Sequence, residues 1–281
     1  MTYSELVADG VKKLTDAGFE EARTDVRALL FCACDMDFMT LLRDGAMQVP
    51  MEQEQRFFEM LEERMKHVPV QYITGEQEFC GLRFGVQPGV LIPRPETELL
   101  AEAVFREASG KRVLDMCTGS GCIAITVAKL GHAAFVAASD YSGEALAIAR
   151  KNAELQEADV TFYQGDLFEN VEGTYDIIVS NPPYIKSSVV EELMPEVRDY
   201  EPRLALDGME DGLLFYRRIC AEAKQYLVQG GRLMFEIGHD QGITVPDILL
   251  AEGYVAIEVK KDYAGLDRMV FAVWPGDNKE I

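Results

Sequence analysis

The residues with the clearest chemical signature are Asn181, Pro182, Pro183 and Tyr184, which follow a run of apolar residues. Both prolines lack a backbone N–H and hold φ at about −65°, so the chain leaves the preceding strand as a stiff arm whose carbonyl oxygens need outside donors. Asn181 adds an amide oxygen, and Tyr184 adds a ring face. These two acceptors and the stacking surface suit a planar –NH2 group. A rigid strand-exit loop with an asparagine turn is the alternative interpretation.

A second signature is the turn formed by Cys117, Thr118, Gly119, Ser120 and Gly121. Glycines at such a turn let the backbone approach a ligand at the carboxyl edge of a parallel sheet. The run 119–124 fits G-x-G-x-x-A, and Asp140 lies at about the offset expected of an acid that binds ribose hydroxyls. A dinucleotide and S-adenosylmethionine are therefore both candidate cofactors, and a purely structural turn is the third interpretation.

A third group, Asp166, Leu167 and Phe168, ends the next predicted strand. We expect the acid to bind an adenine amino group and the apolar residues to cover the ring. A core position is the alternative for Phe168.

This combination favours N-methylation of an amide or an exocyclic amine. Such nitrogens attack poorly because their lone pair is delocalised. The Asn181 side-chain oxygen and the Pro182 carbonyl can hold both N–H bonds and aim the lone pair at a sulfonium methyl, so that positioning and electrostatics supply most of the rate. We predict Asn181, Pro182 and Tyr184 as catalytic residues, and residues 181–184 as the substrate-binding segment.

The elements that must position these residues alternate between strands and helices, which predicts a Rossmann-like, mostly parallel sheet covered on both faces. The predicted strands are 112–116, 134–139, 160–164, 175–180 and 232–237, and the predicted helices between and after them are 123–129, 143–155, 213–227 and 244–251. Residues 255–260 and 268–273 have no helix between them and predict a closing antiparallel hairpin. The end of the chain from Asp277 is expected to be frayed.

The chain before this sheet has a different texture. Residues 1 to about 70 show helical periodicity, with Thr24-Asp25 as the predicted N-cap of the second helix, and predict a small helical bundle. Alternation with glycines over residues 76–90 predicts a β-hairpin linker, and residues 96–106 predict a helix. We expect the bundle to act as a partner-recognition module.

Composition narrows the function further. The chain has 281 residues and a net charge of −21, which disfavours direct nucleic-acid binding and suits a basic protein partner. No apolar run is long enough to span a bilayer, and the start lacks a secretory signal, so we expect a cytoplasmic protein that does not bind membranes. Six scattered cysteines predict free thiols, and three distant histidines argue against a metal site.

The chain resembles the HemK/PrmC family of S-adenosylmethionine-dependent protein-glutamine methyltransferases. The resemblance covers nearly the whole length. Besides Asn181 to Tyr184, it rests on the segments 71–75, 91–98, 200–206, 210–212, 235–238 and 265–268. It implies methylation of the glutamine in the Gly-Gly-Gln motif of class I peptide chain release factors, with S-adenosylhomocysteine as the product and no metal.

The resemblance also implies the architecture and the site. The fold class is α/β, a class I (Rossmann-like) methyltransferase sheet, mostly parallel with an antiparallel C-terminal hairpin, plus a small N-terminal helical bundle. The implied segments are an N-terminal helical domain (1–74), a β-hairpin linker (75–92) and a methyltransferase domain (93–281). The implied cofactor-binding residues are Cys117, Thr118, Gly119, Ser120, Gly121, Asp140, Asp166, Leu167, Phe168 and Asn181, and the implied substrate-binding residues are Asn181, Pro182, Pro183 and Tyr184.

Several alternatives stay open at this point. Cys117 stands where release-factor enzymes usually have glycine and looks like the related ribosomal-protein glutamine methyltransferases. Arg94 is expected either near the cofactor or partner, or in an ion pair with Glu96 or Glu98. A DNA adenine-amino methyltransferase, a nicotinamide-dependent oxidoreductase and a non-catalytic binding module are the remaining alternatives.

Overall fold

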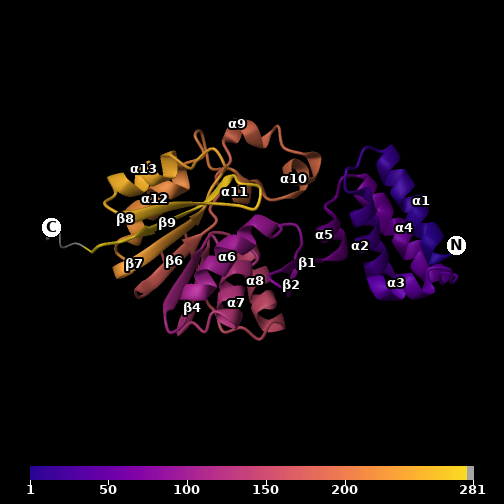
Figure 1. The fold of residues 1–281 in the computed structure, drawn as a ribbon, viewed down its shortest axis with the longest axis horizontal. Helices are drawn as coiled ribbons and strands as arrows, with labels where there is room; N and C mark the ends of the chain where they lie inside the picture. Colours follow the sequence, from indigo (N-terminus) through magenta and orange to yellow (C-terminus); the bar gives the residue numbers. More distant parts are fainter. Residues whose placement is uncertain (277–281) are drawn as a thin grey trace. The chain divides into compact units, whose positions relative to one another are not determined.

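The computed structural model describes residues 1–276 (Figure 1). Contacts divide these residues into two units. Unit 1 comprises residues 1–76 and 194–200, and unit 2 comprises residues 77–193 and 201–276. Residues 194–200 thus group with the N-terminal helices, although the sequence places them in the third predicted segment. The predicted frayed end from Asp277 lies outside the described residues.

Unit 1 is helical, because apolar side chains recur at helical spacing and can be buried together only along one face of each helix. Its helices are α1 (Tyr3–Asp16), α2 (Ala22–Cys34), α3 (Phe38–Asp44), α4 (Met51–Met65), α5 (Val70–Thr74) and, from the later segment, α10 (Pro195–Tyr200). Their shared core includes Leu6, Leu14, Leu29, Leu30 and Phe57. A capping box is present at the start of α1: the Thr2 side chain accepts from the N–H of Glu5, and the Glu5 side chain accepts from the N–H of Thr2.

The predicted N-cap of α2 is wrong. The helix begins at Ala22, with Glu21 at the N-cap position, so Thr24 and Asp25 lie in its first turn. The carboxylate of Asp25 is used elsewhere: it is buried and accepts a hydrogen bond of 2.7 Å from Nε of Arg64 in α4. A buried charge needs a partner, and this need outweighs the local preference of Asp for a cap.

Arg64 also explains why residues 194–200 belong to unit 1. Its guanidinium donates to Glu196 of α10 at 3.1 Å and lies 4.2 Å from the ring centroid of Phe19. Nδ1 of His67 lies 3.0 Å from the same oxygen of Glu196. One buried cation thus joins helices that are 132 positions apart in the sequence.

Unit 2 contains a seven-stranded sheet in the order β5-β4-β3-β6-β7-β9-β8 within the described residues. Its strands are β3 (Arg112–Met116), β4 (Phe135–Asp140), β5 (Thr161–Gln164), β6 (Tyr175–Ser180), β7 (Leu227–Glu236), β8 (Val255–Lys261) and β9 (Asp267–Val273). The helices of this unit are α6 (Pro95–Glu107), α7 (Cys122–Leu130), α8 (Gly143–Leu155), α9 (Ser187–Val190), α11 (Arg203–Leu206), α12 (Leu214–Ala223) and α13 (Thr244–Ala251).

The two faces of the sheet carry separate apolar cores. On one face, Val113, Ile177 and Val179 pack with residues of α6, α7 and α8. On the other, Leu114 and Ile178 pack with residues of α12 and α13. Neighbouring strand residues point to opposite faces, so strands buried on both sides read as continuous apolar runs. Figure 1 shows α7 beside β4, and α13 beside β8.

The predicted sheet is confirmed, with three adjustments. β3, β4, β5, β6 and β7 pair in parallel, and β9 pairs antiparallel with both β7 and β8. β9 therefore lies between its neighbours, and β8 forms the edge. β7 begins at Leu227, five residues before the predicted strand, and α12 ends at Ala223 rather than at residue 227. The pairing of Leu227 with Tyr175 of β6 explains the earlier start.

The predicted hairpin is formed by β1 (Glu76–Phe79) and β2 (Leu82–Gly85). Phe79 and Phe84 are fully buried in the core beneath α6 and α7. Asn152 of α8 binds both backbone groups of Gly85, accepting from its N–H at 2.7 Å and donating to its carbonyl at 3.1 Å.

The turn between β3 and α7 generates a stability prediction. Gly121 has φ of 83°, and an added Cβ would lie 2.9 Å from Cδ1 of Ile125 and 3.1 Å from Cβ of Ala149. Gly119 has φ of 56° and nothing within 4 Å of an added Cβ. We expect Gly119→Ala to lower the free energy of unfolding by roughly 1–2 kcal/mol through backbone strain alone. Gly121→Ala should cost about 1–3 kcal/mol more because of overpacking. Urea unfolding of both variants without ligand measures the difference, and equal losses would contradict it.

Candidate active site

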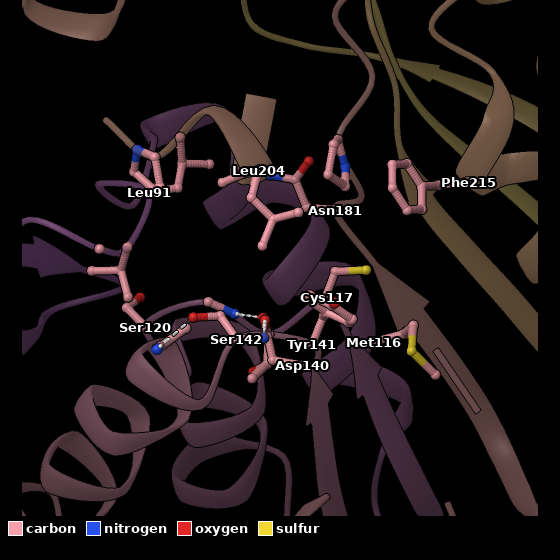
Figure 2. Close-up of a pocket in the computed structure, with 18 of the residues that line it drawn as sticks. Leu91, Met116, Cys117, Ser120, Asp140, Tyr141, Ser142, Asn181, Leu204 and Phe215 are labelled. Atoms are coloured by element: carbon pink, nitrogen blue, oxygen red, sulfur yellow. Dashed lines mark hydrogen bonds between the residues drawn. The ribbon is translucent and has the colours of Figure 1, made fainter. Parts of the chain in front are cut away.

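A cavity of about 530 Å³ in unit 2 is the candidate site. This volume lies in the range typical of small-ligand sites. Its walls come from the turns that follow β3, β4, β5 and β6, from residues 89–97, and from residues 202–218. Figure 2 shows Ser120, Asp140 and Ser142 on one side of the cavity, with Leu91, Leu204 and Asn181 on the other. The carboxyl ends of the parallel strands thus meet at one site, as doubly wound folds require.

The β3–α7 turn forms one wall. Cys117 has φ of 61°, a left-handed conformation that favours glycine. The Asp140 carboxylate accepts hydrogen bonds from the N–H of Gly119 at 2.8 Å and from the N–H of Ser142 at 2.9 Å. Burial raises the pKa of Asp140, although these backbone bonds lower it in part. Asp140 also lines the cavity.

The residues that follow β5 lie partly in the cavity lining and partly in the core. Leu167 lines the cavity, whereas Phe168 is buried in the core and stacks on Tyr226 with 4.7 Å between ring centroids. The Asp166 carboxylate faces Arg218 of α12, which donates to its two oxygens at 3.0 and 3.1 Å. The structure therefore places Phe168 outside the lining, at the core position that was its alternative, and gives Asp166 a cationic neighbour.

Asn181 and Pro183 line the cavity at the end of β6. Nδ2 of Asn181 lies 3.3 Å from Oγ1 of Thr97 in α6. Among residues 1–276, no donor reaches the side-chain oxygen of Asn181 or the carbonyl oxygen of Pro182. Both acceptors that the sequence singles out are thus left without an internal partner.

A buried carboxyl group lies behind this turn. Glu236, at the end of β7, is 2% exposed; its Oε2 accepts from the Thr97 hydroxyl at 2.6 Å, and its Oε1 accepts from the Tyr184 hydroxyl at 3.4 Å. Burial raises the pKa of Glu236 to about 7, although the hydrogen bond from Thr97 lowers it in part. Burial also raises the pKa of Tyr184 above its ordinary value.

A second buried carboxyl group, Glu201, fixes the part of the wall formed by residues 91–94. It accepts from the N–H of Ile92 at 3.2 Å and from the guanidinium of Arg94. Arg94 lines the cavity. Its ion-pair partner is Glu201, and not Glu96 or Glu98 as the sequence suggested. Because Pro202, Arg203 and Leu204 follow Glu201 directly, this contact also links residues 202–204 of the lining to residues 91–94.

Most predicted site residues come together in this cavity. Those that line it are Cys117, Thr118, Gly119, Ser120, Asp140, Asp166, Leu167, Asn181 and Pro183, and those that do not are Gly121, Phe168, Pro182 and Tyr184. Sequence reasoning missed Thr97, Glu236 and Phe215. The first two lie in the segments 91–98 and 235–238, which carry the family resemblance, but their residue types gave no indication of a contact between them.

Comparisons with known proteins agree with this geometry. The family described as Methyltransferase small domain matches residues 94–197, and the PrmC N-terminal domain matches residues 5–75. A solved methyltransferase from Pyrococcus furiosus is 22% identical with a TM-score of 0.53, over 70% of this chain and 90% of that one. The T. Thermophilus 16S rRNA N2 G1207 methyltransferase, solved with AdoMet and guanosine, is 18% identical with a TM-score of 0.51, over 70% and 49%. The fold is that of a class I methyltransferase.

Relatives with higher sequence identity place the chain in a narrower family within this class. The release factor glutamine methyltransferase of Clostridium acetobutylicum is 42% identical over 284 residues, which cover 98% of this chain and 100% of that protein. The chain belongs to the release factor glutamine methyltransferase family, and the resemblance stated from its motifs is confirmed. The oxidoreductase and DNA methyltransferase alternatives are therefore wrong.

Three negative findings apply to the described part of the chain. Its six cysteines are free. No group of three or more His, Cys, Asp or Glu side chains within residues 1–276 is placed to hold a metal ion. No helix in the same range is long and apolar enough to cross a membrane.

The buried carboxyl of Glu236 generates a pH prediction. Its pKa is about 7 in the folded protein against an ordinary 4.5, so the folded state binds this proton more tightly than the unfolded chain does. The stability that protonation contributes is complete below about pH 4.5 and is lost as the pH rises through about 7. The free energy of unfolding of the wild type, relative to Glu236→Gln, should fall between pH 5 and pH 8 by at most about 3 kcal/mol. Urea unfolding at both pH values measures it; a constant difference would contradict the assignment.

Proposed function

We propose that this protein transfers a methyl group from S-adenosylmethionine to the side-chain amide of the glutamine in the Gly-Gly-Gln motif of class I peptide chain release factors. The observation that carries the proposal is the pair of acceptors, the Asn181 side-chain oxygen and the Pro182 carbonyl, that no donor within residues 1–276 reaches. An unpaired acceptor beside a cavity is costly unless water or a ligand donates to it. A primary amide supplies two N–H donors on one nitrogen. Family membership supports the same acceptor group.

The chain's own residues do three things in this proposal. The two acceptors bind the N–H bonds of the glutamine amide and so fix the direction of its lone pair. They also stabilise the positive charge that develops on the nitrogen during alkylation. The Tyr184 ring, held by the contact of its hydroxyl with Glu236, limits the movement of the amide. When bound, S-adenosylmethionine supplies an electrophilic methyl group on a sulfonium.

The residues around the cavity fit this cofactor. The Asp140 carboxylate lines the cavity and can accept hydrogen bonds, which suits the hydroxyls of a ribose. Apolar side chains such as Leu91, Leu167 and Leu204 suit an adenine ring. We therefore keep residues 117–121, Asp140, Asp166, Leu167 and Asn181 as proposed cofactor-binding residues. Phe168 is left with a supporting role beneath the turn because of its stacking on Tyr226.

The N-terminal helices are proposed to recognise the release factor. The net charge of −21 favours a basic partner over a nucleic acid. Action on release factors implies a cytoplasmic enzyme.

A labelling experiment tests the proposed function. The purified protein is incubated with a class I release factor and S-adenosylmethionine that carries a labelled methyl group. We expect one label on the Gly-Gly-Gln glutamine, located by peptide mass spectrometry, and none on a factor with Gln→Ala at that position. Equal labelling of the two factors, or transfer to a ribosomal protein instead, would contradict the proposal.

The role of Asn181 gives a second prediction. Asn181→Ala removes one of the two acceptors and should lower kcat by about 100-fold to 1,000-fold, the size of effect known for a single group that stabilises transition-state charge. Binding of S-adenosylhomocysteine, measured by calorimetry, should change much less. Gln225→Ala, which removes an exposed amide side chain outside the cavity lining, is the control and should keep wild-type kcat. An Asn181→Ala activity within about twofold of wild type would contradict the role.

A further inference from the structure

The hydrogen bonds behind Asn181 form a short chain that ends on a buried carboxyl group. Nδ2 of Asn181 lies 3.3 Å from Oγ1 of Thr97, and Oγ1 of Thr97 lies 2.6 Å from Oε2 of Glu236. Thr97 is 3% exposed and Glu236 is 2% exposed. Water therefore has little access to either group, and each must satisfy its hydrogen bonds within the chain.

The direction of these bonds follows from counting protons. A threonine hydroxyl has one proton to donate. An ionised carboxylate only accepts, so Thr97 must give its proton to Glu236 and keep its lone pairs for other donors. The only group of Asn181 that can donate to such a lone pair is its NH2. The Asn181 oxygen is then the atom left facing away from Thr97.

If Thr97 donates to Asn181 instead of accepting from it, the nitrogen of the Asn181 amide faces the cavity in place of the oxygen. When Glu236 is protonated, its O–H can donate to the Thr97 oxygen, and the Thr97 proton is then free to be donated to the Asn181 oxygen. The amide would then rotate by half a turn and present its NH2 to the cavity. A donor at that position meets the N–H bonds of a substrate amide and repels them, so the acceptor pair is lost although every residue of the turn is still present.

We propose that Glu236 and Thr97 are positioning residues that set the orientation of the Asn181 amide, so that its oxygen and not its nitrogen faces the substrate. This inference rests on the proposed function, since orientation matters only if Asn181 holds a substrate N–H. The second oxygen of Glu236, 3.4 Å from the Tyr184 hydroxyl, restrains the other end of the same turn. One carboxylate thus positions the Asn181 and Tyr184 side chains of the substrate-binding segment.

Substitutions at Thr97 test the orientation directly. Thr97→Val keeps the shape and removes the hydroxyl, and we expect kcat to fall about 10-fold to 100-fold, as misplacement of a reacting group by a remote change does. Thr97→Ser restores the hydroxyl and should recover most of the rate. The matched control is Thr126→Val in α7, because the Thr126 hydroxyl is also buried but has no hydrogen-bond partner among residues 1–276. That control should keep wild-type kcat, and calorimetry with S-adenosylhomocysteine should give similar affinities for all four proteins.

The pH profile gives a readout that a merely structural role would not change. The titratable and charged groups facing Glu236 are Glu96 of α6, Tyr184, Tyr216 of α12 and Arg268 of β9. Burial brings the pKa of Glu236 to about 7. Because the ionised form is the one that orients Asn181, kcat of the wild type should fall as the pH drops through about 7. Glu236→Gln should have a reduced kcat without that acid limb.

The outcomes distinguish a failure of the proposed function from a failure of the positioning role. Wild-type protein that labels no release factor would overturn the proposed function and this inference with it. Normal labelling by the wild type, combined with an unchanged kcat in Thr97→Val or an acid limb that persists in Glu236→Gln, would overturn the positioning role alone. A loss in Thr97→Val that Thr97→Ser does not recover would also overturn it, because the hydroxyl would then not be the essential group.

Discussion

The site depends on one constraint: the chain that leaves β6 has two consecutive residues without an N–H. Pro182 and Pro183 cannot continue the ladder of β6 as donors, so the strand ends there and the carbonyl oxygen of Pro182 is left open. Asn181, immediately before them, lines the cavity and adds a second oxygen without an internal donor among residues 1–276. The adjacent turns after β3 and β4 form the other wall because parallel strands end at the same edge of the sheet. The acceptors lie beside a cofactor-sized cavity because the proline-bearing turn stands at the edge where the parallel strands end.

Much of this arrangement was predictable because it is local. The strand from 175 to 180, the proline-bearing turn and the helix from 143 to 155 have the bounds that alternation and periodicity predict. Asp140 reaches the glycine turn because consecutive strands β3 and β4 are neighbours in the sheet. These predictions needed only the preference of apolar runs for strands and the rule that parallel strands end together.

What could not be predicted depends on contacts between distant residues. Glu236 and Thr97 are separated by 139 positions in the sequence. The residue type alone does not distinguish a buried glutamate from an exposed one. Arg94 forms its ion pair with Glu201 and not with Glu96 or Glu98, because the buried carboxylate of Glu201 needs a cationic partner. Phe168 packs on Tyr226 in the core although its position in the sequence is one residue from the cavity lining. Burial decides each of these cases, and burial is a property of the whole fold.

On the proposed function, an acceptor-only site also explains a choice between two nearly isosteric side chains. A glutamine presents two N–H donors to the oxygens of Asn181 and Pro182. A glutamate presents oxygens, which would leave four acceptors facing one another without a proton, and a site built to bind N–H groups rejects a partner that lacks them by a large factor. The same requirement makes the orientation of the Asn181 amide critical, since turning it replaces an acceptor with a donor. The buried carboxylate of Glu236 is thus tied to selectivity through the single proton of Thr97.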